Sequence, residues 1–288
     1  MLTIFTIPKS FRDGIDIIQR NSIQSWLQLF PKCEIILFGD DEGVMKTAKE
    51  FNILYISEVE KTKLGTPLLS SAITLAQEKA KYDILLYLNT DIILTSDLIS
   101  AVQRIKIPIF LMSGQRWDVD INEEIDFDNP VWENKLREKI IETGELHGPT
   151  GMDYFIIPKS LPDKIKMPRL VVGRPGWDNW LIYRALSLKI PMIDATKVIT
   201  AVHQNHDYSH SKYGNSKKGK VGGPETQMNI KLIGGFDKMC TLKDSDWILT
   251  SEEGLKPKTF FQRFFIRLSL LYPWRLILSF KRKIQFNL

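Results

Sequence analysis

Cysteine is scarce in this chain, and signals for secretion and membrane insertion are missing. The two cysteines, Cys33 and Cys240, provide neither a disulfide framework nor a metal-ligand spacing, which fits a reducing compartment. The first residues lack a basic segment followed by a long apolar one, so no signal peptide is expected. No uninterrupted apolar run reaches the roughly 18 residues of a transmembrane helix.

Common phosphate-binding and nucleophile motifs are also missing. No GxGxxG sequence follows the first expected strand, and the chain has neither a P-loop nor a GxSxG turn. These absences exclude the most common signatures of dehydrogenases, ATPases and hydrolases.

The positive charge is concentrated at the C-terminal end. The 288 residues carry a formal net charge of +5. Residues 255–288 contain eight basic and no acidic residues, so the remainder carries 5 − 8 = −3. A body without a basic surplus argues against a nucleic-acid partner, and the length allows one large domain or two small ones.

The first half of the chain alternates between expected strands and helices. Hydrophobic spacing predicts strands at 2–7, 34–38, 53–56 and 84–88, and helices at 13–30, 43–51 and 66–80. This alternation predicts an α/β fold with a mostly parallel, doubly wound central sheet flanked by helices.

The second half is less regular. Apolar runs predict strands at 109–112, 154–157, 192–194 and 198–202, and helices at 130–142 and 177–188. The acidic stretch 117–128 predicts a loop. The polar, glycine-rich and lysine-rich stretch 209–223 predicts a mobile loop, which either closes over a diphosphate or is simply a solvated surface.

One buried strand ends abruptly at a carboxylate. The apolar run 84–88 is followed by Asn89, Thr90 and Asp91. Ligands bind beyond the carboxyl ends of strands in open α/β sheets, and Mg²⁺ or Mn²⁺ takes carboxylate and phosphate oxygens. Asp91 is therefore a candidate metal ligand facing a nucleotide diphosphate, and the alternative is an ordinary turn residue.

A second candidate carboxylate begins a predicted helix. Asp178 follows a Pro-Gly turn, where an aspartate is often an N-cap. The functional alternative is a general base that deprotonates an acceptor hydroxyl. The neighbouring Trp177 and Trp180 either stack on a sugar ring or belong to the core.

Histidines gather in the segment 203–210, which holds three of the four in the chain. Their spacing matches no standard zinc site. His203 or His206 is instead a candidate metal ligand or diphosphate contact, and the sequence does not choose between them. A polar turn is the structural alternative.

Several blocks in order resemble GT-A-type glycosyltransferases, including bacterial enzymes of polysaccharide assembly. The resemblance covers about residues 1–250 and rests on the blocks 65–67, 87–91, 114–118, 150–155, 173–180 and 203–208. Residues 89–91 resemble the DxD motif of that fold, with asparagine in the first acidic position. The resemblance implies that Asp91 binds a Mn²⁺ or Mg²⁺ ion that bridges the two phosphates of a nucleotide sugar.

The resemblance also implies roles for residues outside the motif. Asp153 would face the donor or acceptor sugar, and Arg116 is a candidate partner for a phosphate or carboxylate. Each implied residue also has a structural explanation, as a turn residue, an N-cap or a solvated charge. The nucleotide pocket would be formed by Asp40, Lys63, Gly65, Thr66, Asn89 and Thr90.

The C-terminal end predicts a basic amphipathic helix. Phe260, Phe264 and Leu268 share one face, and Arg263 and Arg267 lie on another. Such helices lie in membrane interfaces, so residues 258–288 predict attachment to a membrane surface, and packing on the core is the alternative.

Together these features predict a metal-dependent glycosyltransferase, inverting if Asp178 is the base, that acts on a glycan or lipid-linked acceptor. A cytoplasmic location at the inner face of the membrane is expected. The expected organisation is a domain over 1–250, with halves 1–112 and 113–250, and a tail over 251–288. A catalytically degenerate scaffold and a nucleotidyltransferase are the alternatives.

Overall fold

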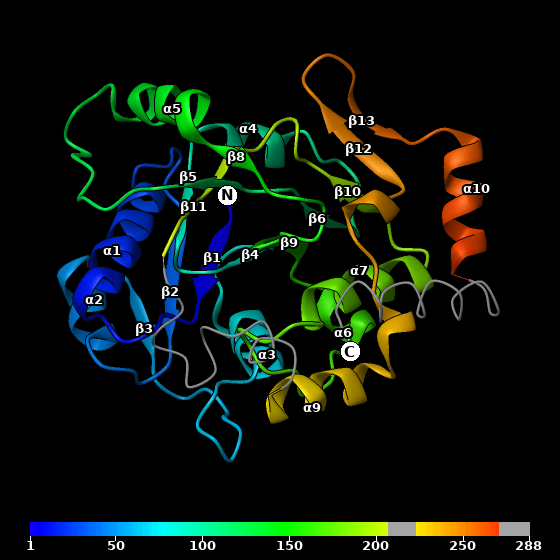
Figure 1. Ribbon diagram of the computed structural model, residues 1–288, viewed down its shortest axis with the longest axis horizontal. Helices are drawn as coiled ribbons and strands as arrows, with labels where there is room; N and C mark the ends of the chain where they lie inside the picture. The colour runs from blue at the N-terminus through cyan, green and yellow to red at the C-terminus, as the bar shows by residue number, and fades with distance from the viewer. Residues whose placement is uncertain (207–222, 271–288) are drawn as a thin grey trace.

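The computed structural model describes residues 1–206 and 223–270, and its central sheet is flanked by helices (Figure 1). Among the described residues, nine strands form the large sheet in the order β13-β12-β10-β6-β9-β4-β1-β2-β3. These strands are β1 (Thr3–Thr6), β2 (Glu34–Phe38), β3 (Leu54–Ile56), β4 (Ile84–Leu88), β6 (Leu111–Ser113), β9 (Tyr154–Pro158), β10 (Met192–Asp194), β12 (Trp247–Thr250) and β13 (Gly254–Pro257).

A second sheet and the helices complete the described part. The second sheet has the order β5-β11-β7-β8, with β5 (Ile92–Leu94), β7 (Trp117–Val119), β8 (Glu145–Leu146) and β11 (Ala201–Gln204). The helices are α1 (Asp13–Leu27), α2 (Val44–Glu50), α3 (Leu69–Lys79), α4 (Asp97–Gln103), α5 (Trp132–Thr143), α6 (Leu161–Ile165), α7 (Trp177–Ser187), α9 (Pro224–Ile233) and α10 (Phe260–Ser269), with short 3₁₀ turns at Phe236–Lys238 and Leu242–Asp244.

Most neighbouring strands of the large sheet are parallel. β2 and β4 both run parallel to β1, and β3 runs parallel to β2. β9 is antiparallel to both β4 and β6, so these two strands point the same way. The carboxyl ends of β1, β2, β3, β4 and β6 therefore meet at one edge of the sheet, as the predicted mostly parallel α/β fold requires.

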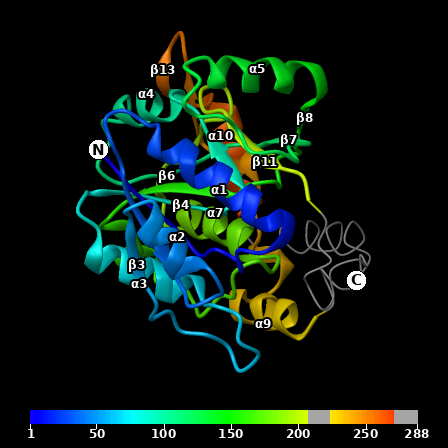
Figure 2. The ribbon, with the colours of Figure 1, turned by 90° about the vertical axis from the view of Figure 1, so that its left-hand side faces the viewer.

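The two faces of the sheet carry separate cores, because alternate side chains of a strand point to opposite faces. In β1, Phe5 packs in a core shared with α3, α6 and α7, whereas Ile4 packs with α1, α2 and α4. Figure 2 shows the molecule from the side of α1 and α2. Helices on both faces confirm the predicted doubly wound arrangement.

Some elements of the second half differ from the sequence prediction. Residues 117–119 form β7 instead of a loop, because Val119 is buried against α5. β11 begins three residues later than the predicted strand. The hydrophobic pattern also missed β8, α6, α9, β12 and β13. β13 lies inside the range 251–288 that was assigned to the tail, but it pairs with β12, which lies before that range. The predicted domain boundaries themselves stay a prediction.

Trp26 joins helix α1 to the strand that follows Asp91. Its side chain is fully buried, and Nε1 donates a hydrogen bond of 2.9 Å to the carbonyl of Ile92. Trp26→Phe is expected to lower the free energy of unfolding by about 1–3 kcal/mol, because that carbonyl loses its donor in a buried setting.

Denaturant titration checks this prediction. The control is Ile141→Val at a position that is 84% exposed, where a change within about 0.5 kcal/mol is expected. Equal stability of Trp26→Phe and the wild type would contradict the importance of this link.

Candidate active site

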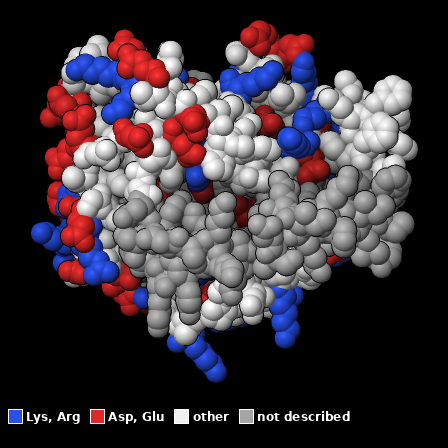
Figure 3. Space-filling view, viewed as in Figure 1, with Lys and Arg blue, Asp and Glu red and all other residues white. Residues whose placement is uncertain are grey.

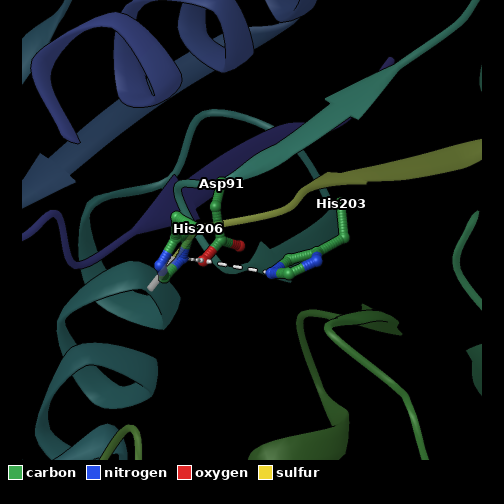
Figure 4. Close-up of side chains that lie close together, drawn as sticks. All are labelled: Asp91, His203 and His206. Atoms are coloured by element: carbon green, nitrogen blue, oxygen red, sulfur yellow. Dashed lines mark hydrogen bonds and ion pairs between the residues drawn. The ribbon is translucent and has the colours of Figure 1, made fainter. Parts of the chain in front are cut away.

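Asp91 lies in the turn between β4 and β5, at the edge where the parallel strands end. His203 of β11 and His206 just beyond it approach this carboxylate from the second sheet (Figure 4). Asp91 Oδ2 lies 3.2 Å from His206 Nε2 and 3.9 Å from His203 Nε2. One ligand atom from each of the three residues lies within 4.8 Å of the others. The structure thus brings three predicted metal ligands into one cluster.

Gln204 fixes the geometry of this cluster. Its backbone N–H donates to the carbonyl of Asp91 at 3.1 Å, next to the antiparallel pairing of β11 with β5. The side chain is fully buried, donates to the Ile18 carbonyl at 2.8 Å and to Ser22 Oγ at 2.9 Å, and accepts from Asn21 at 3.0 Å. β11, which carries His203, is therefore held against both β5 and α1.

The charges in the cluster suit a divalent cation. Burial would raise the pKa of Asp91, but the hydrogen bond from His206 and the charges of His203 and Lys9 hold this pKa well below its usual range. Burial lowers the pKa of His203, which favours the neutral imidazole. Asp91 Oδ1 is buried and has no hydrogen-bond partner among the described residues. An ionised carboxylate that has one oxygen without a hydrogen-bond partner, beside a neutral imidazole, matches what metal ligation requires.

The structure explains why asparagine stands at position 89. Asn89 Nδ2 donates to Asp153 Oδ1 at 2.7 Å, and Asn89 Oδ1 accepts from the hydroxyl of Tyr87 at 3.2 Å. Asp153 is also ion-paired with Arg116. An aspartate at position 89 would place two carboxylates in contact, so Asn89 bridges two protein groups there instead of adding a second acid.

An ion-pair network extends from Arg116 toward the cluster. Arg116 Nε lies 2.8 Å from Asp118 Oδ1, and His203 Nδ1 lies 3.0 Å from the same oxygen. His147 Nδ1 lies 2.6 Å from Asp118 Oδ2. Burial raises the pKa of Asp118, but the contacts with His147 and Arg116 outweigh it and lower this pKa.

Sequence analysis missed Asp118 and His147. Asp118 stands in the block 114–118 that carried the resemblance, and this was the only available signal for it. Nothing in the sequence around His147 marked it, because its contact arises from the pairing of β7 with β8.

Asp178 lies in the first turn of α7, but it is not the N-cap. Gly176 is the N-cap of this helix, and Asp178 Oδ1 accepts a hydrogen bond of 2.8 Å from the backbone N–H of Asn179. Burial raises the pKa of Asp178 to about 6. The charges of Asp91 and Asp178 both act on Tyr87, whose pKa is raised mainly by burial.

The two tryptophans of α7 lie in the core. Trp177 and Trp180 are 5% and 6% exposed. The Trp177 ring contacts Tyr87 and Phe155 edge-on, with a centroid distance of 5.4 Å in each case. In this packing the rings have little free face for a sugar, so their role in acceptor binding stays a prediction.

The predicted nucleotide-pocket residues Asp40, Lys63 and Gly65 follow β2 and β3, whose carboxyl ends lie at the same sheet edge as that of β4. Asp40 is exposed and ion-paired with Lys61. Lys63 and Gly65 are exposed, and Gly65 adopts a positive φ of 85° in its turn. Their predicted contacts with the nucleotide stay a prediction.

Thr66 and Thr90 are engaged by other protein groups. Leu68, and not Thr66, is the N-cap of α3. The hydroxyl of Thr66 instead donates a hydrogen bond of 2.9 Å to the buried Glu225 of α9. Thr90 Oγ1 is buried 2.8 Å from Thr6 Oγ1. Except for Gly223, the predicted mobile loop 209–223 lies outside the described residues.

Comparisons with known proteins find structures but no sequence family. No family model matches the chain, and no curated protein matches it. S. aureus TarS 1–349 in complex with UDP-GlcNAc is 14% identical, with a TM-score of 0.49, over 81% of this chain and 65% of that one. GalNAc-T7 with UDP, GalNAc and Mn²⁺ is 15% identical, with a TM-score of 0.49, over 80% of this chain and 47% of that one.

A third structure is glucosyl-3-phosphoglycerate synthase from Mycobacterium tuberculosis with Mg²⁺ and UDP. It is 13% identical, with a TM-score of 0.40, over 72% of each chain. The chain thus spans less than two thirds of the length of the TarS and GalNAc-T7 structures. These similarities concern the fold alone.

Proposed function

We propose that this chain is a GT-A-type glycosyltransferase that moves a sugar from a nucleotide diphosphate to an acceptor and depends on a divalent cation. The observation that carries the proposal is the cluster of Asp91, His203 and His206 at the carboxyl edge of the sheet, in which Asp91 Oδ1 is buried and has no hydrogen-bond partner among the described residues. Ligands of open α/β sheets bind at this edge.

The donor set favours Mn²⁺ over Mg²⁺. Mg²⁺ prefers oxygen ligands throughout, whereas two of the three candidate ligands are imidazoles, which suit transition metals. A cation bound there would neutralise the charge that develops on the leaving diphosphate. Asp91 and the two histidines would hold this cation, and its remaining coordination positions would be left for phosphate oxygens.

Asp178 is the proposed general base. Its carboxylate would take the proton of the acceptor hydroxyl as that oxygen attacks the anomeric carbon, which implies inversion. A pKa raised to about 6 by burial suits this task, because the group remains ionised at neutral pH and is a stronger base than an exposed aspartate.

The pH dependence of transfer tests this role. Protonation of Asp178 removes the base, so kcat/KM is expected to rise with pH through about 6 and to level off above it. The assay uses saturating Mn²⁺, because protonation of His203 or His206 would also weaken metal binding. An acidic limb that moves with the Mn²⁺ concentration would assign the titration to the metal ligands and contradict this assignment.

The proposed acceptor is a glycan or a lipid-linked glycan at the cytoplasmic face of a membrane. The basic residues from 255 onward, with no acidic residue among them, support this location. In the described part of the chain, no helix is long and apolar enough to cross a membrane.

Incubation with a panel of nucleotide sugars tests the proposed reaction. Release of nucleoside diphosphate from at least one donor is expected with Mn²⁺, with less release with Mg²⁺ and none with EDTA. The degenerate scaffold is not favoured, because it gives no reason for an open, ionised carboxylate between two histidines. If no donor of the panel binds and none releases nucleoside diphosphate, the scaffold alternative would be favoured instead.

A further inference from the structure

Helix α10 exposes a contiguous aromatic surface. Four phenylalanines on it are 71%, 72%, 52% and 63% exposed, in the order Phe260, Phe261, Phe264 and Phe265. Ring contacts of 5.8–6.4 Å between centroids link them into one patch, called here the phenylalanine face. Grouped exposed aromatics mark an interaction surface, whereas single exposed apolar residues do not.

The orientation of this helix is fixed by its other side. The capping box between Thr259 and Gln262 begins the helix, and Ile266 packs against the core. Arg263 on the same helix is half-buried, whereas Arg267 is exposed. The side of α10 that carries Ile266 therefore lies toward the protein, and the phenylalanine face is left outward.

The figures agree with this placement. α10 lies at the edge of the molecule beyond β12 in Figure 1. In the matching space-filling view, Figure 3, the upper part of that edge is white, without acidic or basic side chains. A surface of this kind takes an apolar partner.

The charge of the neighbouring sequence selects lipid as that partner. From residue 255 to the end of the chain there are eight basic and no acidic residues, including Arg275 and the triplet Lys281-Arg282-Lys283. Aromatic residues that insert among acyl chains, combined with basic residues that meet anionic headgroups, are the pattern of interfacial membrane binding. A second copy of the chain would instead place two basic segments of the same sign against each other.

We propose that the phenylalanine face inserts into the surface of an anionic membrane, while the side of α10 that carries Ile266 stays packed on the core. Insertion is therefore driven by aromatic burial, and the basic residues beyond α10 add attraction to anionic lipid. The phenylalanine face would then be the surface by which the proposed enzyme reaches a lipid-linked acceptor. Only this purpose, and not the membrane binding itself, rests on the proposed function.

Vesicle co-sedimentation tests the proposal with the full chain. Vesicles of phosphatidylglycerol and phosphatidylcholine are compared with vesicles of phosphatidylcholine alone, and stronger binding to the anionic vesicles is expected. Replacing all four phenylalanines by serine is expected to weaken this binding by roughly 100-fold, since four apolar side chains no longer leave water.

A matched control replaces four exposed apolar residues elsewhere by serine. These are Phe30, Met45, Ile141 and Leu232, which are 86%, 51%, 84% and 42% exposed. Binding within about twofold of the wild type is expected for the control, because none of the four belongs to the phenylalanine face. High salt is expected to weaken wild-type binding without abolishing it, since only the charged part is screened.

Two further results keep the test decisive. Thermal shift by Mn²⁺ and nucleoside diphosphates is expected to be the same in the phenylalanine variant and the wild type, which shows that the body is folded and separates this proposal from the transfer reaction. Equal vesicle binding by wild type and variant would overturn the proposal. So would a dimer seen by light scattering that binds no vesicles and dissociates in the variant.

Discussion

Replacing Asp91 by asparagine is expected to lower kcat/KM for transfer at least about 10³-fold, equivalent to roughly 4 kcal/mol of transition-state stabilisation. The reason is that Asp91 is the one carboxylate of the three-residue cluster, and its buried Oδ1 has no hydrogen-bond partner among the described residues. Mn²⁺ affinity is expected to fall with it. Initial rates with a nucleotide sugar and calorimetric titration with Mn²⁺ measure the two effects.

Asp120 provides the matched control for that variant. It lies near the cluster in sequence and space, and its carboxylate accepts a hydrogen bond from Asn205 at 2.8 Å, but it is not a member of the cluster. Asp120→Asn is expected to retain Mn²⁺ affinity and activity. An Asp91→Asn enzyme that keeps both would show that the cluster does not hold the metal.

Replacing Asp178 by asparagine is expected to lower kcat by about 10²–10⁴-fold, the usual contribution of a positioned general base. The amide keeps the shape and the hydrogen bond from Asn179, so the fold and the donor KM are expected to change little. Steady-state kinetics with a fixed acceptor measure this split between kcat and KM.

Asp163, in the first turn of α6, is the control for Asp178 because it also begins a helix. Asp163→Asn is expected to leave kcat unchanged. If Asp178→Asn retains the wild-type kcat, the role of Asp178 is limited to the first turn of α7, and the inverting mechanism loses its base.

The central part of the site was predictable because it follows from strand ends. The short apolar run of β4 and the carboxylate beyond it placed Asp91 at the ligand-binding edge. The density of polar residues after the predicted strand 198–202 made His203 and His206 candidate ligands. These inferences need only local pattern and the rule that parallel strands share an edge.

Other parts of the site depend on contacts between segments far apart in the chain. Thr66 pairs with Glu225, which lies 159 residues away, and the sequence near Thr66 holds no sign of it. Asn89 is explained by Asp153, 64 residues away, although the motif alone made it look like a missing acid. Periodicity predicts which face of a helix or strand is buried, but not which residues from distant segments contact that face.

The C-terminal helix shows the same limit. The spacing of Phe260 and Phe264 predicted an amphipathic helix, and the structure confirms a helix at Phe260–Ser269. Only the structure shows that Ile266 packs on the core and that Phe260, Phe261, Phe264 and Phe265 form one exposed aromatic patch on this helix. Residues 271–288 of the predicted tail lie outside the described part.

The most direct test of the account is calorimetric titration of the wild-type chain with a panel of nucleoside diphosphates, in Mn²⁺ and in EDTA. If Asp91, His203 and His206 hold a cation for a diphosphate, at least one nucleotide binds in Mn²⁺ and its affinity is largely lost in EDTA. Equal affinity in Mn²⁺ and EDTA, or no binding of any nucleotide in Mn²⁺, would contradict the proposed site.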